Sequence, residues 1–347
     1  VPIYATGHPE YLRGDEIASN KAIVRKNDIL LCKINPRINR VWVVSDESGK
    51  QNIASSEWIV IRNSEYNPEF LAWYFRTPKF QKFMTSEITG IGGSLTRAQP
   101  KCVAEYPVPV LNRKKQDEIV NILDKCKLVI DSRKRELLEL DNIIKARFVE
   151  MFGDININDK HWECEPLGEL CTIVRGGSPR PIEQFLGGDV PWIKIGDATD
   201  GDNIYLSSTK EHIIQEGVKK SRLVKAGSLI FANCGVSLGF ARIITFDGCI
   251  HDGWLAMEGI DERLDKVFLL QALNQMTEHF RAIAPAGTQP NLNTAIMKAY
   301  KQVIPPIELQ RDFIRFVKQV NKSKVKVQKA LDETQKLFDS LMQQYFG

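Results

Sequence analysis

Apolar side chains recur at steps of three and four along residues 107–153. They are Ile119, Leu123, Cys126, Ile130, Leu137, Leu140, Ile144, Phe148 and Met151. In a helix this spacing places them on one narrow stripe, which is typical of a coiled-coil seam. After its opening prolines the segment has no proline or glycine until Gly153. The pattern therefore predicts a long helix that packs against another helix along one face.

The chain repeats this segment at its end, in residues 303–347. Gln116 corresponds to Gln310 and Gly153 to Gly347, each pair 194 positions apart. The matching stripes predict a two-stranded coiled coil. Its expected seam residues are Leu123, Ile130, Leu137, Ile144, Phe148, Val317, Leu331, Phe338 and Met342. Polar residues interrupt the stripe at Arg133, Lys324 and Thr334, where they either fix the register or mark a docking partner.

The repeat extends upstream of both helices. Residues 24–31 resemble residues 224–231, each a basic turn followed by an apolar strand. Further strands are expected at residues 41–44 and 57–61, and at 241–245 and 253–257. Amphipathic helices follow at residues 68–88 and 264–283, and each leads into a glycine-containing loop. The repeated unit is therefore a small α+β domain followed by a long helix.

These segments define four expected regions: α+β domains at 1–106 and 154–302, and spacer helices at 107–153 and 303–347. The simplest packing of the two seams is antiparallel, with a pseudo-two-fold axis between the repeats. A helix of roughly 39 residues spans about 58 Å. The first domain opens at Val1-Pro2-Ile3-Tyr4, which resembles Val190-Pro191-Trp192-Ile193. A counterpart of residues 161–189 is therefore expected to be missing from its front.

Composition narrows the class of protein. The chain is 43% hydrophobic and 26% charged, as soluble globular proteins are. It has no apolar run near the roughly 20 residues of a membrane helix and no signal-peptide pattern at its start, so we expect no membrane and a cytoplasmic location. Seven scattered cysteines without a C-x-x-C pair predict reduced thiols. The net charge of +4 is only a weak pointer to an anionic partner.

Motifs for catalysis or metal binding are scarce. The sequence lacks G-x-x-x-x-G-K-[ST] and H-E-x-x-H, and its five histidines have no metal-ligand spacing. Asn35-Pro36-Arg37 lacks the second proline and aromatic ring that an amino-methyltransferase would use. His251-Asp252 is either an acid/base pair or, as we favour, an ordinary turn between strands. We therefore expect no catalytic residues and no metal in this chain.

Signals for nucleic-acid binding are better. Residues 21–40 carry six basic side chains against the single acidic Asp28, with asparagines between them. Such residues contact phosphates and base edges, although a solvated strand-and-turn surface shows the same composition. The glycine pair Gly176-Gly177, flanked by arginines, either lets the backbone approach phosphate or forms a strand-to-strand turn. In the second glycine loop, Gln and Asn either read adenine, or Gly287 and Asn293 cap the neighbouring helices.

The residues that we predict to contact nucleic acid come from these segments and from the two glycine loops. They are Lys33, Asn35, Arg37, Arg40, Ser94, Thr96 and Arg97 in the first half, and Arg175, Gly176, Arg180, Lys219, Lys220, Arg242, Thr288, Gln289, Asn291 and Asn293 in the second.

The doubled order of these motifs resembles the specificity (S) subunit of type I restriction-modification systems, over essentially the whole chain. The most specific parts are two proline-containing strands, each followed by a glutamine and a long helix, and the openings of the second domain. They read Pro107-Val108-Pro109-Val110-Leu111 with Gln116, Ile304-Pro305-Pro306-Ile307 with Gln310, Leu167-Gly168-Glu169-Leu170, and Val190-Pro191-Trp192-Ile193. The resemblance implies two α+β target recognition domains joined by two long antiparallel coiled-coil helices.

The resemblance also implies a function. In that family each target recognition domain reads one half of a split double-stranded DNA sequence, and the helices set the gap. The S subunit has no catalytic residues; it docks two methyltransferase (M) subunits, through which restriction and translocase (R) subunits join. No cofactor is expected on this chain, and S-adenosylmethionine, Mg²⁺ and ATP are expected only on partner subunits. The first domain, short at its front, is expected to read its half imperfectly or to be completed by something outside this chain.

Two other functions remain open from the residues alone. A structural coiled-coil adaptor whose domains bind protein would show no steep loss of binding with salt, unlike a protein that neutralises phosphates. A self-sufficient DNA methyltransferase would transfer methyl groups as the isolated chain, and the missing catalytic motif argues against it.

Overall fold

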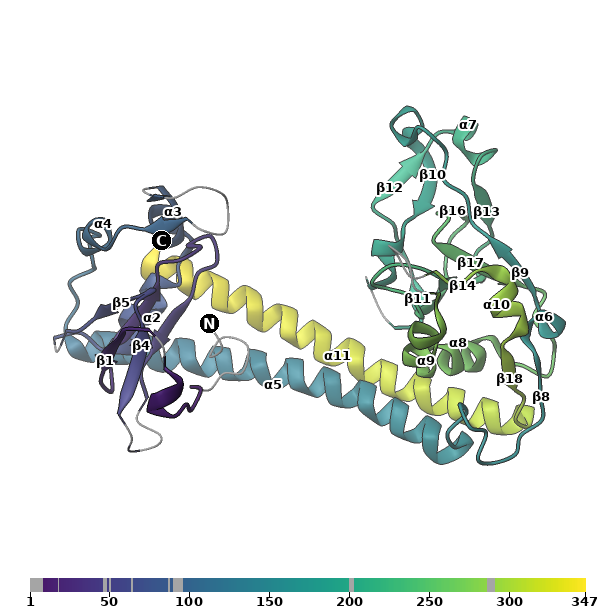
Figure 1. The fold of residues 1–347 in the computed structure, drawn as a ribbon, viewed down its shortest axis with the longest axis horizontal. Helices are drawn as coiled ribbons and strands as arrows, with labels where there is room; N and C mark the ends of the chain where they lie inside the picture. The colour runs from purple at the N-terminus through teal and green to yellow at the C-terminus, as the bar shows by residue number, and fades with distance from the viewer. Residues whose placement is uncertain are drawn as a thin grey trace. The chain divides into compact units, whose positions relative to one another are not determined.

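The fold was derived from a computed structural model that describes residues 9–17, 19–45, 49, 51–63, 65–86, 88–89, 96–199, 203–285 and 291–347. The chain divides into two compact units (Figure 1). Unit 1 comprises Val1–Glu136 and Val327–Gly347, and unit 2 comprises Leu137–Lys326. Each long helix therefore contributes one part of its length to each unit.

In the described part of unit 2, two sheets of four and five strands pack around a shared core. Among the described residues, the larger sheet has the order β11 (Tyr205–Leu206), β15 (Ala241–Ile244), β14 (Leu229–Ala232), β17 (Trp254–Glu258) and β9 (Thr172–Arg175). The smaller has the order β12 (Glu211–Ile213), β10 (Leu186–Ile193), β16 (Gly248–Ile250) and β13 (Arg222–Val224). Ile230 and Trp254 of the larger sheet pack against Ile250 of the smaller, so this face is fully buried.

Helices cover the opposite face of the larger sheet. Because successive strand residues point to opposite faces, Leu229 and Phe231 face this second layer, where Phe268 of α8 is buried with them. The short helices are α6 (Leu167–Leu170), α7 (Gln215–Val218), α8 (Lys266–Gln275), α9 (Thr277–Ile283) and α10 (Thr294–Ala299). Strand β8 (Cys164–Pro166) pairs with β18 (Lys301–Val303), and two 3₁₀ turns lie at Ile182–Gln184 and Ile195–Thr199.

Unit 1 repeats this plan with fewer described strands. Its elements are the 3₁₀ turn Gly14–Glu16, β1 (Lys21–Val24), β2 (Ile29–Cys32), β3 (Val41–Val43), β4 (Asn52–Ser55), β5 (Trp58–Ile61), α2 (Pro68–Phe75), α3 (Pro78–Ser86), β6 (Ile88–Thr89), β7 (Arg97–Ala98) and α4 (Pro100–Ala104). The sheet order β3-β2-β5 matches β15-β14-β17 of unit 2, while β1 pairs with β4 as β13 pairs with β16.

The strand register confirms the predicted α+β repeat. Ile29 pairs with Val43 on one side and Ile61 on the other. Leu229, 200 positions later, pairs with Ile243 and Met257 in the same way.

The two units differ at one sheet edge. In unit 2, β9 pairs with β17 and the side chains of Leu255 and Met257 are almost fully buried. Within the described part of unit 1, no strand takes the place of β9 beside β5, and Ile59 and Ile61 remain partly exposed. Residues 1–4, which we aligned with residues 190–193, lie outside the described residues.

The amphipathic helices predicted at 68–88 and 264–283 are each two helices. Thr77 separates α2 from α3; its hydroxyl accepts a hydrogen bond from Phe80 N at 3.3 Å, and Pro78 follows it. Since proline disfavours the helical conformation in the residue before it, the chain breaks there. In unit 2 the equivalent Thr277 donates to Gly239 O at 3.1 Å, so this break is tied to the neighbouring loop.

The long helices are α5 (Arg113–Phe152) and α11 (Ile307–Phe346). Both begin several residues after the predicted 107 and 303, because prolines precede them. In unit 1, Ile119 and Leu123 near the start of α5 share a core with Phe346 at the end of α11. In unit 2, Phe148 near the end of α5 lies 5.4 Å from Phe313 near the start of α11. These contacts confirm the predicted antiparallel pairing.

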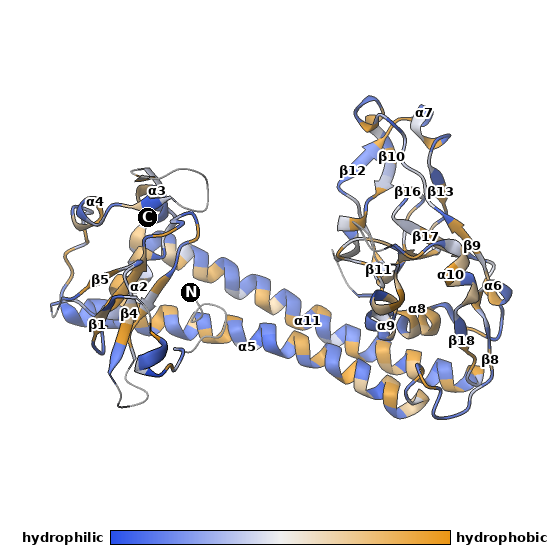
Figure 2. Cartoon of the chain, in the orientation of Figure 1, coloured by the Kyte–Doolittle hydropathy of each residue, from blue (hydrophilic) through white to orange (hydrophobic). Residues whose placement is uncertain are grey.

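The predicted seam residues are buried or half-buried along the two long helices. Apolar positions recur along both helices between polar ones (Figure 2). Leu123, Ile130, Ile144, Phe148, Val317 and Leu331 are buried, and Leu137, Phe338 and Met342 are half-buried. Of the polar interruptions, Lys324 Nζ lies 2.6 Å from Asp141 Oδ1 of the facing helix, Thr334 donates to Ala330 O, and Arg133 pairs with Glu136. Lys324 is therefore the interruption that ties the two helices together.

A buried glutamine joins each long helix to its α+β unit. Gln116 Oε1 accepts from Asn67 N at 2.7 Å, and its Nε2 donates to Leu111 O at 2.8 Å. Asn67 caps helix α2, so the glutamine fixes the start of α2 against the start of α5. In unit 2, Gln310 Oε1 accepts from Asp265 N at 2.9 Å, where Asp265 caps α8.

Replacing Gln310 by alanine should lower the stability of unit 2. Its Nε2 also donates to Pro305 O at 2.7 Å and Arg263 O at 2.8 Å. The substitution therefore leaves these buried backbone groups without their hydrogen-bond partner. A loss of about 1–3 kcal/mol is expected for an unsatisfied buried group. Urea unfolding measures it, with Gln328→Ala on the exposed face of α11 as the control. Equal losses in both variants would show that the buried contacts are not what matters.

No disulfide links any of the seven cysteines in the structure. No helix in the described ranges is both long and apolar enough to cross a membrane.

Candidate nucleic-acid interface

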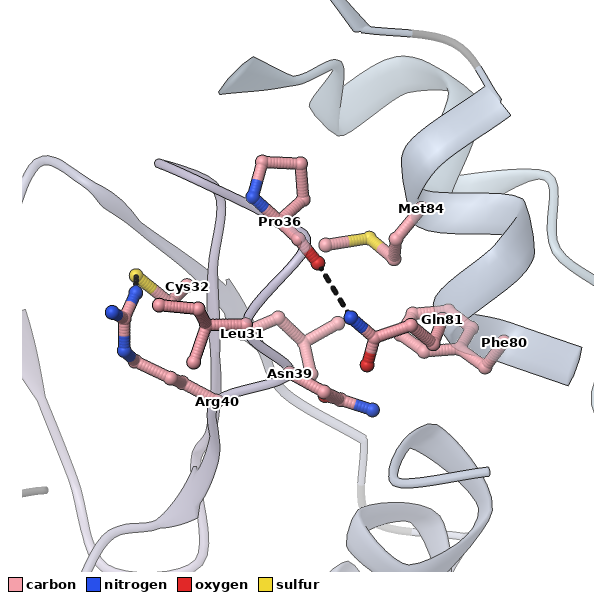
Figure 3. Close-up of a pocket in the computed structure, with 9 residues that line it drawn as sticks. Leu31, Cys32, Pro36, Asn39, Arg40, Phe80, Gln81 and Met84 are labelled. Carbon is pink, nitrogen blue, oxygen red and sulfur yellow. Dashed lines mark hydrogen bonds between the residues drawn. The ribbon is translucent and has the colours of Figure 1, made fainter. Parts of the chain in front are cut away.

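The basic segment of unit 1 places residues 33–40 in the loop between β2 and β3. Asn35 adopts a left-handed conformation with a φ of 46°, which asparagine tolerates better than most residues. Asn39 Nδ2 donates to Phe75 O at 2.9 Å, and Gln81 Nε2 of α3 donates to Pro36 O at 2.9 Å (Figure 3). The loop is thus held against two helices in one conformation.

The predicted residues of this loop have different surroundings. Arg37 is exposed, and Lys33 and Asn35 are half-buried. The guanidinium of Arg40 turns back toward Cys32 Sγ at 3.7 Å and Ile34 O at 3.5 Å (Figure 3). Arg37 is therefore better placed than Arg40 to meet a phosphate.

The residues after the first glycine loop pair with the 33–40 loop. Asn35 N donates to Thr96 O at 2.8 Å, and Ile34 forms a β-bridge with Arg97. Thr96 is only 5% exposed, which argues against its predicted contact with nucleic acid. Ser94 lies outside the described residues.

Arg97 forms a bidentate ion pair with Glu57. Its Nε and one Nη lie 3.0 and 3.1 Å from the two carboxylate oxygens. The hydrogen bond from Arg97, together with the nearby charge of Lys33, holds the pKa of Glu57 below its usual value, against a smaller opposing effect of burial. Glu57 lies 40 positions from Arg97, and the two side chains meet only because β5 pairs with β2.

Unit 2 gathers five of its predicted residues around one loop. Arg175 Nε donates to Asp252 O at 2.9 Å, and Arg180 lies 3.7 Å from the Asp252 carboxylate. Lys219 and Lys220 follow the short helix α7 and are exposed. Ser221 Oγ donates to Gly177 O at 2.7 Å, which ties the lysines to the arginine-flanked loop. A basic surface forms from two separate segments of the chain, with Asp252 between the two arginines.

The glycine pair in this loop has a packing role. A Cβ at Gly176 would lie 2.2 Å from His251 O, and one at Gly177 would lie 3.0 Å from Lys220 O. Only glycine fits position 176 without a shift of the neighbouring backbone. Gly176 N donates to Trp254 O at 2.9 Å and Gly177 N to Ile250 O at 3.0 Å, so both backbone donors are used within the unit. The structure thus favours the turn interpretation of Gly176 over its predicted contact with phosphate.

Arg242 does not lie on this surface. It is 5% exposed in β15, an interior strand of the larger sheet, and its Nη1 donates to Ala241 O at 2.7 Å. Strands covered on both faces bury all their side chains. The prediction of a DNA contact by Arg242 is therefore at odds with the fold.

The second glycine loop ends at residues with local partners. Asn293 Oδ1 accepts from Ile296 N at 2.9 Å and so caps α10, the structural alternative for this residue. Asn291 is half-buried, and its Oδ1 accepts from Asn233 Nδ2 at 3.1 Å. Thr288 and Gln289 lie outside the described residues.

The His251-Asp252 pair forms the turn between β16 and β17. Gly253 N donates to His251 Nδ1 at 2.9 Å, so that nitrogen carries no proton to give to Asp252 Oδ1, also 2.9 Å away. Burial lowers the pKa of His251, which favours this neutral form. Asp252 instead accepts from Ser178 Oγ at 2.9 Å. These bonds favour the turn interpretation over an acid/base pair.

Comparison with known proteins adds a sequence match. A family described as "Type I restriction modification DNA specificity domain" matches residues 159–334, about half of the chain. The specificity subunit of the type I restriction enzyme MjaIX from Methanocaldococcus jannaschii is 22% identical over 187 residues. That match covers 49% of this chain and 40% of the relative, so the chain spans less than half the length of that protein.

Solved structures share the fold. A chain from a study titled "Structural basis underlying complex assembly and conformational transition of the type I R-M system" aligns with a TM-score of 0.61 and 18% identity, over 98% of this chain and 86% of that one. The S subunit of a type I restriction-modification system from M. genitalium aligns with a TM-score of 0.54 and 15% identity, over 91% and 82%. At these identities the likeness concerns the fold alone.

Proposed function

Because this chain belongs to the family of type I restriction modification DNA specificity domains, we propose that it is a non-catalytic DNA-reading subunit that recognises a split target. Each α+β unit binds one half of the target sequence. The observation that carries the proposal is the duplication: the two units share one strand register, and each exposes basic residues, Arg37 in unit 1 and Lys219 and Lys220 in unit 2.

In this proposal, one set of side chains positions the protein on the DNA backbone and another set reads the base sequence. Lys33 and Arg37 in unit 1, and Arg180, Lys219 and Lys220 in unit 2, meet phosphate oxygens, which set register without reporting sequence. Residues at the loop ends read base edges. The test is binding of the full chain to duplex DNA as salt is raised, because each phosphate contact releases counterions and makes the affinity fall. Binding that does not change with salt would support the structural adaptor instead.

Partner subunits supply the chemistry in this proposal. Two methyltransferase subunits dock on the long helices, and restriction subunits join through them. Apolar side chains exposed on the helices support a docking role: Ile122, Leu128 and Val129 on α5, and Val325 and Leu337 on α11. S-adenosylmethionine, Mg²⁺ and ATP belong to those partners, and the assembly acts on DNA in the cytoplasm.

Changing Lys219 and Lys220 together to alanine should weaken binding to all sequences alike. The plot of log affinity against log salt has a negative slope, and each lost phosphate contact makes it less steep by about 0.9. The double variant should therefore show a slope that is less steep by about 2. Fluorescence anisotropy at several salt concentrations measures it. Lys326→Ala with Lys329→Ala on α11 removes the same charge elsewhere and serves as the control. An equal change in the control would show that net charge, not this surface, governs binding.

A further inference from the structure

The junction between the strand-connecting loop and the end of the glycine loop is built alike in both units. In unit 1, Lys33 N donates to Glu57 O at 2.9 Å, and Ala98 N donates to Lys33 O at 2.9 Å. The bridge from Ile34 to Arg97 closes the junction. Lys33 is thus fixed between the turn before β5 and strand β7.

The same three links recur in unit 2. Asn233 N donates to Gly253 O at 2.9 Å, and Leu292 N donates to Asn233 O at 2.8 Å. Cys234 forms the bridge to Asn291. Lys33, Glu57 and Arg97 of unit 1 therefore occupy the positions of Asn233, Gly253 and Asn291 in unit 2.

Different side chains stand on this shared backbone. In unit 1 they form a charged trio. Arg97 forms an ion pair with Glu57, and Lys33 adds a second positive charge beside the same carboxylate. The side chains of Arg97 and Glu57 are 42% and 29% exposed, so the pair lies at the surface. Gripping one edge of the guanidinium fixes its plane before any ligand arrives, which reduces the entropy lost on binding.

In unit 2 the same positions hold two asparagines and a glycine, here called the amide trio. Asn233 is fully buried, and its Nδ2 donates to Asn291 Oδ1 at 3.1 Å and Leu292 O at 3.1 Å. Its Oδ1 has no hydrogen-bond partner among the described residues. Asn291 is half-buried, with its amide held by the asparagine behind it. Asn291, hydrogen-bonded to Asn233, therefore stands in unit 2 where Arg97, paired with Glu57, stands in unit 1.

We propose that this junction is a base-reading position in both units, with Arg97 recognising guanine and Asn291 recognising adenine. The proposal rests on the proposed function and names the bases that it would read. Arginine matches O6 and N7 of guanine, and asparagine matches N6 and N7 of adenine, through paired hydrogen bonds in the major groove. Glu57 and Asn233 are positioning residues that act through Arg97 and Asn291.

The two trios are exchangeable in one direction only. A Cβ at Gly253 would lie 2.5 Å from Ile195 Cγ1 and 2.9 Å from Cys234 Sγ, so unit 2 does not admit the glutamate of unit 1. Unit 1 has no such restriction, because it already carries a side chain at position 57. The informative variant therefore places the amide trio in unit 1: Lys33→Asn, Glu57→Gly and Arg97→Asn.

The experiment is selection from a randomised duplex library by the full chain together with its partner subunits. The unchanged chain should favour guanine at one position of the unit 1 half by roughly 5- to 150-fold, as a bidentate contact of about 1–3 kcal/mol gives. The triple variant should prefer adenine there, and the unit 2 half should stay unchanged. Arg97→Lys keeps the charge but not the paired donors, and should lose the preference without gaining another.

A second arginine-carboxylate pair of unit 1 provides the control. Arg62 grips Asp28 through two hydrogen bonds of 2.7 and 2.6 Å. Arg62→Lys should lower the melting temperature but leave the selected sequence unchanged. If Arg97→Lys also lowers the melting temperature and leaves the sequence unchanged, Arg97 is only a structural tie and the inference fails. If the unchanged chain selects no sequence at all, the proposed function fails with it.

Discussion

Replacing Phe313 by alanine is expected to lower the free energy of unfolding of unit 2 by about 3–5 kcal/mol, the cost of deleting a buried aromatic ring. Phe313 is fully buried near the start of α11. Its ring lies 5.4 Å from both Phe148 and Phe152 at the end of α5. The substitution therefore opens a cavity where the helix pair meets the core of the unit.

Chemical unfolding with a probe in each unit measures this loss. Phe316→Ala is the matched control, because Phe316 lies one turn further on the same helix and is only half-buried. We expect a clearly smaller loss from the control. Similar losses for the two variants would mean that the contacts of Phe313 with α5 are not what stabilises unit 2.

Replacing Leu137 by proline should disrupt the spacing between the two proposed DNA half-sites. Leu137 is half-buried in the interior of α5, where proline removes a helix hydrogen bond and kinks the chain at a cost of about 3 kcal/mol or more. We expect the variant to bind each half-site but to accept several gap lengths. Leu137→Ala, which preserves the helix, should keep the single gap.

The distribution of gap lengths among selected duplexes is the readout. A single, unchanged gap in Leu137→Pro would remove the long helices from any role in setting the spacing. Loss of all binding in the proline variant, with Leu137→Ala unaffected, would show instead that each half-site depends on the intact helix.

The long helices and the repeat could be predicted because their signal is periodic. Residues such as Leu123 and Phe148 recur at a spacing that only a helix turns into one face, and Gln116 and Gln310 keep one separation. The role of those glutamines could not be predicted. Their partners Asn67 and Asp265 lie more than forty positions away and meet them only after packing.

The candidate interface was less predictable, because composition does not reveal which side of a strand a residue faces. Arg242 reads as basic surface, yet β15 lies inside a sheet that is covered on both faces. The composition around Gly176 suggests a phosphate-binding loop, yet Gly176 N donates its hydrogen bond to Trp254 O within the unit. The pairing of Glu57 with Arg97 could not be predicted, since nothing local in the sequence connects the two residues.

The repeat itself carries a signal for the junction of Lys33 with Arg97 and of Asn233 with Asn291, because these residues occupy equivalent positions in the two halves. Lys33 and Asn233 are separated by 200 positions, as are Ile29 and Leu229, whereas Arg97 and Asn291 keep the 194 positions of the helices. The difference reflects loops of unequal length between the equivalent strands and helices. Only the pairing of strands fixes which residues meet across those loops.

The most direct test of split-target recognition is sequencing of the duplexes that the full chain and its partner subunits select from a random library. We predict two short defined blocks separated by a constant number of undefined positions. A single defined block, or no enriched sequence at low salt, would contradict recognition by two equivalent units.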